Sequence, residues 1–284
     1  MYKYQVKVPE NLPEMTLQAY VARAFPLLSA AALRAAFEHK DVKMNGVRSQ
    51  KQQLVIPGSE IVIFTNVEMQ MPVAYEDEHI LIINKPAGVS TDEDRFGSMT
   101  VLDWATAYAK GAFEPRMCHR LDNQTSGLMV LAKHEKAEEA LKNMFSVHSG
   151  EKEYRCLVRG VPSPRSAVKT AWLTKDPVRA KVHIKDKETN GAKKIVTEYT
   201  TLRAGDVSLM SILLHTGRTH QIRAHMQHLG HPLLGDDVYG DREFNRQQRA
   251  KGLALCAVRL KIDTLGALPA IDGVEARIKA PFET

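Results

Sequence analysis

Two short amphipathic helix patterns occur near the start of the chain, and strand signals follow them. In the first pattern apolar residues recur at helical spacing, and before the second Ser29 stands where a helix-capping side chain is expected. The apolar positions are Leu17, Tyr20, Val21, Ala24 and Phe25, then Ala32, Leu33, Ala36 and Phe37. The pair Asn45-Gly46 predicts a two-residue hairpin, and a short apolar strand is predicted over residues 61–64. We therefore predict a small separate α/β unit of residues 1–65.

A short methionine-rich linker, residues 66–72, leads to the larger part of the chain, residues 73–284. Its first strong signal is the unbroken apolar run Ile80-Leu81-Ile82-Ile83, which is typical of a strand covered on both faces. Helices are predicted at residues 100–109 and 137–145, and strands at residues 154–158, 194–202, 207–214 and 253–262. Because helices and strands mix without a regular β-α-β alternation, we predict an α+β fold with a mixed, largely antiparallel central sheet and flanking helices.

Composition narrows the class of protein. The 284 residues are 44% hydrophobic, which is enough for a sizeable core, and the net charge of +6 favours a polyanionic partner. The three cysteines, Cys118, Cys156 and Cys256, are far apart, which argues against a disulfide framework or a cysteine-rich zinc site and fits a reducing compartment. Neither a signal peptide nor an apolar run of about 20 residues is evident. We expect a cytoplasmic protein with no membrane contact.

The segment from His119 to Gly127 is the strongest candidate for chemistry. It places Arg120 and Asp122 before a Thr-Ser-Gly turn and an apolar, strand-forming stretch. An arginine beside an acid favours the ionised carboxylate, and the turn fixes the direction in which the carboxylate points. That suits a nucleophile or an electrostatic stabiliser. The alternative is a loop salt bridge followed by an ordinary turn.

Two further clusters follow along the chain. Lys152-Glu153-Tyr154 opens a predicted strand, where a tyrosine is most often a core residue with its hydroxyl at the surface. Residues 217–223, Gly-Arg-Thr-His-Gln-Ile-Arg, form a turn and a predicted helix whose first turns carry Arg218 and Arg223. The histidines that follow, His225 and His228 among them, have a spacing that zinc ligands can use. No His-Glu-x-x-His motif is present, however, so we expect no metal site.

These three clusters, in this order, resemble the motifs of the RluA-like family of RNA pseudouridine synthases, the large-subunit rRNA type. The matching strings are His-Arg-Leu-Asp-x-x-Thr-Ser-Gly at residues 119–127, Lys-x-Tyr at 152–154, and Gly-Arg-Thr-His-Gln-Ile-Arg at 217–223, which continues to Gly235-Asp236. The resemblance implies the pseudouridine synthase fold, with Asp122 as the catalytic aspartate, Arg223 as its partner and Tyr154 stacking on the target base. It further implies that Arg120 fills the space that the flipped nucleotide leaves. The remaining implied substrate-binding residues are His119, Thr125, Arg218, His220 and Gln221.

Residues 1–65 resemble an S4-type RNA-binding domain, which this family often carries. The resemblance implies auxiliary RNA contacts by Arg34, Lys40, Lys43 and Arg48. Residues 1–65 depart from the usual S4 pattern in charge. They contain eight Lys and Arg but also five Asp and Glu, and few of the cations lie on the second helix. A stabilising appendage with weak RNA affinity is therefore the alternative.

The resemblance implies an isomerase that converts uridine to pseudouridine in RNA and needs no cofactor, metal or nucleotide. We expect large-subunit rRNA as the substrate, with tRNA as the alternative, and a monomeric enzyme. Two other classes of protein remain: a non-catalytic RNA-binding assembly factor on the same fold, and a glycoside hydrolase. The hydrolase requires a second carboxylate across the bond, and no second acid occupies a comparably strong motif.

Overall fold

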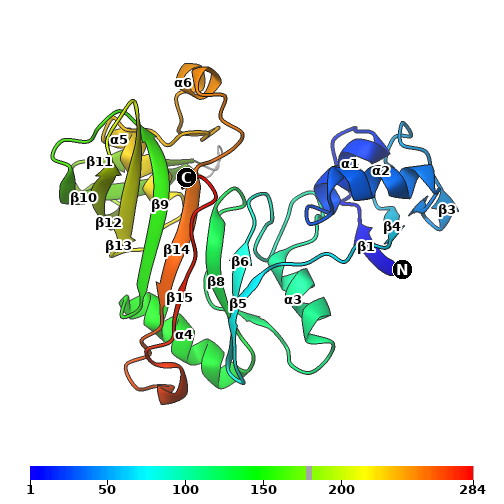
Figure 1. Ribbon diagram of the computed structural model, residues 1–284, viewed down its shortest axis with the longest axis horizontal. Helices are drawn as coiled ribbons and strands as arrows, with labels where there is room; N and C mark the ends of the chain where they lie inside the picture. The colour runs from blue at the N-terminus through cyan, green and yellow to red at the C-terminus, as the bar shows by residue number, and fades with distance from the viewer. Residues whose placement is uncertain (177–180, 284) are drawn as a thin grey trace. The chain divides into compact units, whose positions relative to one another are not determined.

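The computed structural model describes residues 1–176 and 181–283. The chain folds into two compact units (Figure 1). The first combines Met1–Pro72 with Gly88–Pro115, and the second combines Val73–Ala87 with Arg116–Thr284, so the chain passes between the units three times. In the described residues no helix is both long and apolar enough to cross a membrane.

This division differs from the predicted one, which makes residues 66–72 a linker and places residues 88–115 in the larger domain. Met69 is buried in the core of the first unit, and its carbonyl accepts a hydrogen bond of 3.0 Å from the Trp104 indole. Phe96 packs against the same core. The first unit is therefore completed by a distant segment, and this long-range packing leaves no local pattern in the sequence.

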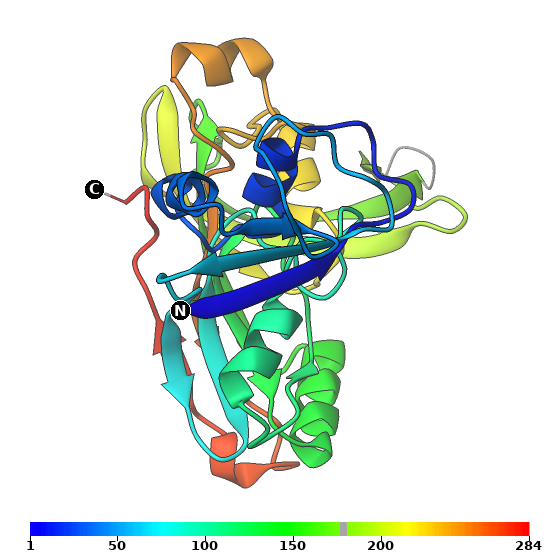
Figure 2. The same ribbon diagram turned by 90° about the vertical axis from the view of Figure 1, so that its right-hand side faces the viewer.

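The first unit has a small antiparallel sheet in the order β1-β4-β2-β3. Its elements are β1 (Tyr2–Lys7), α1 (Leu17–Ala24), α2 (Ala30–Glu38), β2 (Val42–Met44), β3 (Val47–Arg48), β4 (Glu60–Thr65) and α3 (Val101–Ala109). Thr16 and Ser29 cap α1 and α2 through their hydroxyl oxygens, the second as predicted. The hairpin at Asn45-Gly46 joins β2 to β3, also as predicted. Figure 2 shows β1, which the sequence analysis misses, beside β4.

The second unit is built on one large mixed sheet, and the predicted α+β fold class is confirmed. Its strands run in the order β11-β10-β12-β13-β9-β14-β8-β6-β5, with β15 beside β14 and β7 beside β8. The strands are β5 (Val73–Glu76), β6 (Ile80–Lys85), β7 (Arg116–Met117), β8 (Ser126–Ala132), β9 (Glu151–Arg159), β10 (Ser166–Asp176), β11 (Lys181–Lys185), β12 (Lys193–Arg203), β13 (Val207–Leu214), β14 (Leu255–Lys261) and β15 (Glu275–Arg277). The helices are α4 (Glu135–Val147), α5 (Gln221–His228), α6 (Arg242–Gln247) and the 3₁₀ turn η1 (Pro269–Ile271).

Helix α4 covers one face of this sheet beside β8 (Figure 1). Its apolar stripe, which includes Leu141 and Met144, packs in one buried cluster with Ile80 and Ile82 of β6 and Val130 of β8. The continuous apolar run predicted for β6 is thus a central strand, because both of its faces are buried. This packing holds β6 and β8 side by side, and the segments that flank them carry the candidate site.

The junction between β8 and β14 pairs two strands in parallel, whereas the other strand pairs in the described part of the chain are antiparallel. At this junction Gly127 lies opposite Ala257 and has a φ of +111°. A Cβ atom at Gly127 would lie 2.3 Å from the Ala257 carbonyl oxygen and 2.4 Å from its nitrogen. The glycine of the Thr-Ser-Gly turn is therefore required by both its backbone angle and the close approach of a neighbouring strand.

Gly127→Ala is expected to lower the free energy of unfolding by roughly 2–4 kcal/mol, since it combines backbone strain with a clash against backbone atoms. Gly266→Ala is the matched control, because Gly266 also has a positive φ but open space around the added Cβ; we expect it to cost roughly 1 kcal/mol. Urea unfolding of both variants measures the difference. Equal losses would show that the approach of Ala257 does not constrain this position.

Candidate active site

Asp122 lies in the segment between β7 and β8, in the turn that precedes β8. The backbone N–H of Thr125 donates a hydrogen bond of 3.0 Å to the Asp122 carbonyl, which closes a tight turn, and Thr125 itself is buried. The side chain of Asp122 is 24% exposed. The turn and the strand start thus hold the carboxylate in a fixed direction while leaving it accessible.

Arg223, in the first turn of α5, is the cation that faces Asp122. Its Nη1 lies 3.5 Å from Asp122 Oδ2. The stronger partner is Asp236, whose two carboxylate oxygens accept hydrogen bonds of 2.7 Å from Nε and 2.9 Å from Nη2. Both members of this second pair are almost completely buried, at 5% and 0% side-chain exposure. A two-point contact of this kind fixes the plane of the guanidinium, so Asp236 determines how Arg223 presents Nη1 to Asp122.

Asp236 is itself held by its own turn. Its Oδ1 accepts hydrogen bonds from the backbone N–H groups of Val238 (2.8 Å) and Tyr239 (2.9 Å). Burial acts to raise the pKa of Asp236, but the hydrogen bonds and charge of Arg223, together with these two N–H groups, hold that pKa below its usual range. The carboxylate is therefore ionised at neutral pH and gives the buried Arg223 a full counter-charge.

His220 is the third group at Asp122. It stands immediately before α5 in a left-handed conformation, and its Nε2 lies 3.8 Å from Asp122 Oδ2. Burial lowers the pKa of His220, although the nearby Asp122 acts to raise it. Its Nδ1 lies 3.0 Å from the hydroxyl of Tyr239, and that hydroxyl already accepts a hydrogen bond from Val182 N–H. Tyr239 thus holds one ring nitrogen of His220, and the other, Nε2, is directed at Asp122.

Lys85, at the end of β6, forms hydrogen bonds with the segment that carries Asp122. It is 0% exposed, and its Nζ donates hydrogen bonds of 3.1 Å to the carbonyls of Pro86 and Asn123. Burial lowers the pKa of Lys85 to about 7, against the opposing effect of Asp122. Since Asn123 directly follows Asp122, this lysine ties the loop after β6 to the turn that carries the carboxylate.

Tyr154 lies within β9, where its register partners are Ile212 on β13 and Ala257 on β14. The side chain is buried. Burial raises the pKa of the phenol, and the charge of Asp122 adds to the shift. Tyr154 is therefore a neutral ring near the carboxylate over the whole physiological pH range.

The other residues implied as substrate-binding fall into two groups. Arg120 and Arg218 are exposed, although Arg218 lies in the turn before α5 and not in the predicted helix, because α5 begins at Gln221. His119 and Gln221 instead hold the scaffold. His119 Nε2 accepts a hydrogen bond from Val130 N–H, and the buried amide of Gln221 bonds four groups of the preceding turn and of β12: Thr216, Arg218, Val196 and Thr197.

The two histidines with zinc-ligand spacing, His225 and His228, each contact a different side chain. His225 Nδ1 lies 3.0 Å from the Thr197 hydroxyl, and His228 Nε2 lies 2.8 Å from Asp186. Within residues 1–176 and 181–283, no group of three or more His, Cys, Asp or Glu side chains is arranged to hold a metal ion.

Sequence reasoning assigns no role to Lys85, Asp236 or Tyr239. Lys85 and Asp236 do lie in recognisable strings, Asn84-Lys85-Pro86 and Gly235-Asp236. These strings are the signal that the sequence offers, but the hydrogen bonds from Lys85 to Asn123 and from Arg223 to Asp236 join segments that lie apart in the chain. Tyr239 lies in no such string.

Comparisons with known proteins give a consistent result. Residues 79–228 match the family model described as RNA pseudouridylate synthase. An RNA pseudouridine synthase of Aquifex aeolicus is 32% identical over 80% of this chain and 77% of the relative. The ribosomal large subunit pseudouridine synthase D of Zymomonas mobilis is 33% identical over 75% of this chain and 69% of the relative. Human RNA Pseudouridylate Synthase Domain Containing 1 superposes with a TM-score of 0.63 at 26% identity, covering 75% of this chain and 84% of that one.

Asp236 and Asp237 both lie near Arg223, and they allow a matched test of the buried Arg223–Asp236 pair. Asp236→Asn removes a buried counter-charge and is expected to cost about 3 kcal/mol in unfolding free energy and to lower turnover, since Arg223 is no longer held toward Asp122. Asp237→Asn removes a carboxylate that is 78% exposed and 3.4 Å from Arg223, so it should change stability by no more than about 0.5 kcal/mol. If Asp236→Asn and Asp237→Asn had equal unfolding free energies and equal turnover, Asp236 would not be the residue that holds Arg223.

Burial of Lys85 predicts a dependence of stability on pH. The unfolded chain keeps this lysine protonated to about pH 10, whereas the folded chain releases the proton near pH 7. Between those values the unfolded state binds more protons, so stability rises with pH. Measured relative to Lys85→Met, the unfolding free energy of the natural chain should increase from about pH 7 to about pH 9. A difference that stays constant over this range would mean that Lys85 keeps its proton in the folded state.

Proposed function

The chain belongs to the RNA pseudouridylate synthase family, and we propose that its substrates are uridines of large-subunit ribosomal RNA, with Asp122 as the catalytic aspartate. The observation that carries the proposal is the placement of Asp122: an accessible carboxylate at the start of a central strand, faced by an arginine whose position is fixed by a buried carboxylate. The rRNA target is supported by the Zymomonas mobilis relative, whose name specifies the ribosomal large subunit.

The family reaction detaches the uracil from ribose C1′ at N1, turns it and rejoins it through C5. In the proposed mechanism Asp122 attacks the sugar as a nucleophile or removes a proton from it. Arg223 Nη1 and His220 Nε2 face the same oxygen, Asp122 Oδ2, so they orient the carboxylate and leave Oδ1 for the substrate. Bond exchange within one nucleotide requires no oxidant, reductant or phosphate donor.

The base has to leave its stack before it reaches Asp122, which costs a few kcal/mol. We assign two residues to this step. Arg120, exposed and two positions before Asp122, can occupy the vacated space, because its planar cation both stacks and donates several hydrogen bonds. Tyr154 lines the base pocket as a neutral ring, and one base stacked on an aromatic ring is worth about 1–3 kcal/mol.

We propose that the first unit is an S4-type domain that adds an RNA contact. Arg34, Lys40 and Arg48 line one pocket of this unit, whereas the Nζ of Lys43 lies 5.1 Å from the centre of the Phe64 ring. The first three cations therefore share one surface.

We further propose that the enzyme acts as a monomer in the cytoplasm. The three cysteines support a reducing compartment, since all are free and buried.

The proposal is tested in cells that lack the gene. The natural chain should restore specific pseudouridines in large-subunit rRNA, whereas Asp122→Asn should restore none, because it keeps the shape of the side chain but removes its charge. With purified proteins, turnover by Asp122→Asn should fall by a factor on the order of 10⁴, while RNA affinity stays close to that of the natural chain. Pseudouridine mapping and a binding titration measure the two effects.

Three results would contradict parts of the proposal. Product formation by the Asn variant would remove Asp122 from the catalytic role. Sites restored in tRNA instead of rRNA would overturn the proposed target. Absence of any restored site, with RNA binding intact, would indicate a non-catalytic RNA-binding protein.

A further inference from the structure

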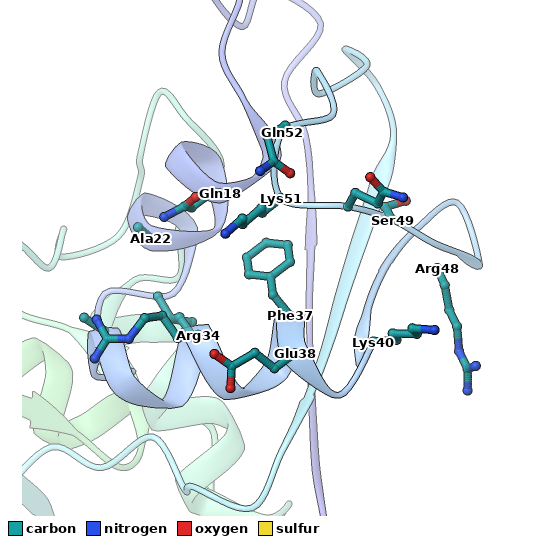
Figure 3. A pocket seen from close by; sticks show the side chains of 13 residues that line it. Gln18, Ala22, Arg34, Phe37, Glu38, Lys40, Arg48, Ser49, Lys51 and Gln52 are labelled. Carbon is teal, nitrogen blue, oxygen red and sulfur yellow. The ribbon is translucent and has the colours of Figure 1, made fainter.

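A pocket of about 690 Å³ opens on the first unit between α1, α2 and the segment that follows β3 (Figure 3). This is within the range of small-molecule sites, roughly 300–1,000 Å³. Residues 18–52 supply the whole lining, so the pocket belongs to the first unit alone. Its members are Gln18, Ala22, Ala30, Leu33, Arg34, Phe37, Glu38, Lys40, Arg48, Ser49, Gln50, Lys51 and Gln52. We call it the Phe37 pocket.

Phe37 supplies the aromatic surface of this pocket. The ring is partly buried and packs against the core of the first unit, while Figure 3 shows it rising from α2 into the pocket, between Lys51 and Glu38. It is the single aromatic residue of the lining described above. A ring that is anchored on one side and open on the other provides a flat surface for stacking.

The rim of the Phe37 pocket is strongly basic. Its lining contains four cations, Arg34, Lys40, Arg48 and Lys51, against the single carboxylate of Glu38. The amides of Gln18 and Gln52 supply hydrogen-bond donors and acceptors beside them. Charge of this sign and density fits a polyanion and not an apolar or cationic ligand.

The backbone of the rim is held in place before any ligand binds. Leu17 N–H donates to the carbonyl of Gln53 (2.7 Å), and Gln18 N–H donates to that of Lys51 (3.0 Å), which ties this segment to the start of α1. At the other end Ser49 N–H donates to the Val42 carbonyl (3.1 Å). The segment that carries Lys51 is therefore fixed at both ends.

Lys40 occupies an unusual backbone position at the rim. It follows the end of α2 with a φ of +61°, and the bonds from Lys40 N–H to Phe37 and from Asp41 N–H to Ala36 form the helix-ending motif in which glycine is preferred. A lysine there bears conformational strain that a glycine would not. Strain at a non-glycine residue is common at functional sites, and here it places a cation at the pocket.

We propose that the Phe37 pocket binds an unpaired nucleotide of the RNA substrate, with the base stacked on Phe37 and the flanking phosphates held by the four cations. A surface that contacts only duplex phosphates needs no aromatic ring among its cations, whereas unstacked bases of single-stranded RNA are recognised by stacking within a basic groove. This inference rests on the proposed function, because it takes RNA as the substrate. It adds that the first unit prefers single-stranded segments of that RNA.

Substitution of the ring separates stacking from charge. Phe37→Leu keeps an apolar side chain against the core but removes the flat surface, and Phe37→Tyr keeps it. For the full-length chain and an oligouridylate of about ten nucleotides, we expect Phe37→Leu to weaken binding by roughly 5- to 100-fold, with the slope of log affinity against log salt unchanged. Phe37→Tyr should bind like the natural chain.

A second pair of variants tests the cation and supplies the control. Lys40→Gly removes the charge and relieves the left-handed strain, so it should not destabilise the fold, yet it should flatten the salt slope by roughly 0.7 for a single strand. Phe64→Leu removes an aromatic ring from β4 of the same unit, outside the Phe37 pocket, and should leave oligouridylate affinity unchanged. Unfolding midpoints of all variants show whether a loss of binding reflects a loss of structure.

Each outcome decides the proposal. Phe37→Leu binding oligouridylate as tightly as the natural chain would overturn it. A second contrary result is that the natural chain binds a paired RNA duplex as tightly as it binds oligouridylate, with this affinity lowered by Lys40→Gly but not by Phe37→Leu. That result would show a phosphate-binding surface without base recognition and would also overturn the proposal. Pseudouridine formation by the natural chain on rRNA is scored separately, so its absence would count against the proposed function, and its presence without a Phe37 effect would count against this pocket alone.

Discussion

The buried pair between Arg223 and Asp236 is the interaction on which the candidate site depends. Taking a guanidinium out of water is expensive, and a two-point contact with an ionised carboxylate, itself held by two backbone N–H groups, offsets that cost. Once Arg223 is held in this way, one of its N–H groups remains directed at Asp122. Asp122 therefore has a cationic neighbour whose position does not depend on Asp122 itself.

Two other constraints position the turn that carries Asp122. On one side, Gly127 allows the backbone of β14 to approach β8 in parallel. On the other, Lys85 joins the loop after β6 to Asn123. Asp122 is thus fixed by strand geometry, by a buried lysine and by the ion pair, which come from three separate parts of the second unit. Rigid support of this kind lets a carboxylate act without first losing side-chain freedom.

Sequence reasoning predicts those features whose cause is local. The capping hydroxyl of Ser29, the hairpin at Asn45-Gly46 and the buried strand β6 each follow from a short pattern and are present. Strands β1 and β10 are not predicted, since neither contains a continuous apolar run; β1 does alternate apolar and polar residues, a signal that could have identified it. The predicted proximity of Arg223 and Asp122 comes from motif resemblance. Asp236 holds Arg223 more tightly than Asp122 does. This could not be predicted, since it depends on how the turn that carries Asp236 packs against α5.

The interleaved course of the chain has a consequence for its biosynthesis and its evolution. Residues 88–115 complete the first unit, although they follow a segment that contributes strands β5 and β6 to the second. During synthesis the first unit cannot finish its core until residue 115 has left the ribosome, when part of the second sheet is already made. For the same reason the first unit is no detachable module: a gene rearrangement that exchanged residues 1–65 would leave Met69 and Phe96 without their packing partners. The two units are therefore expected to change together in evolution and not by simple domain exchange.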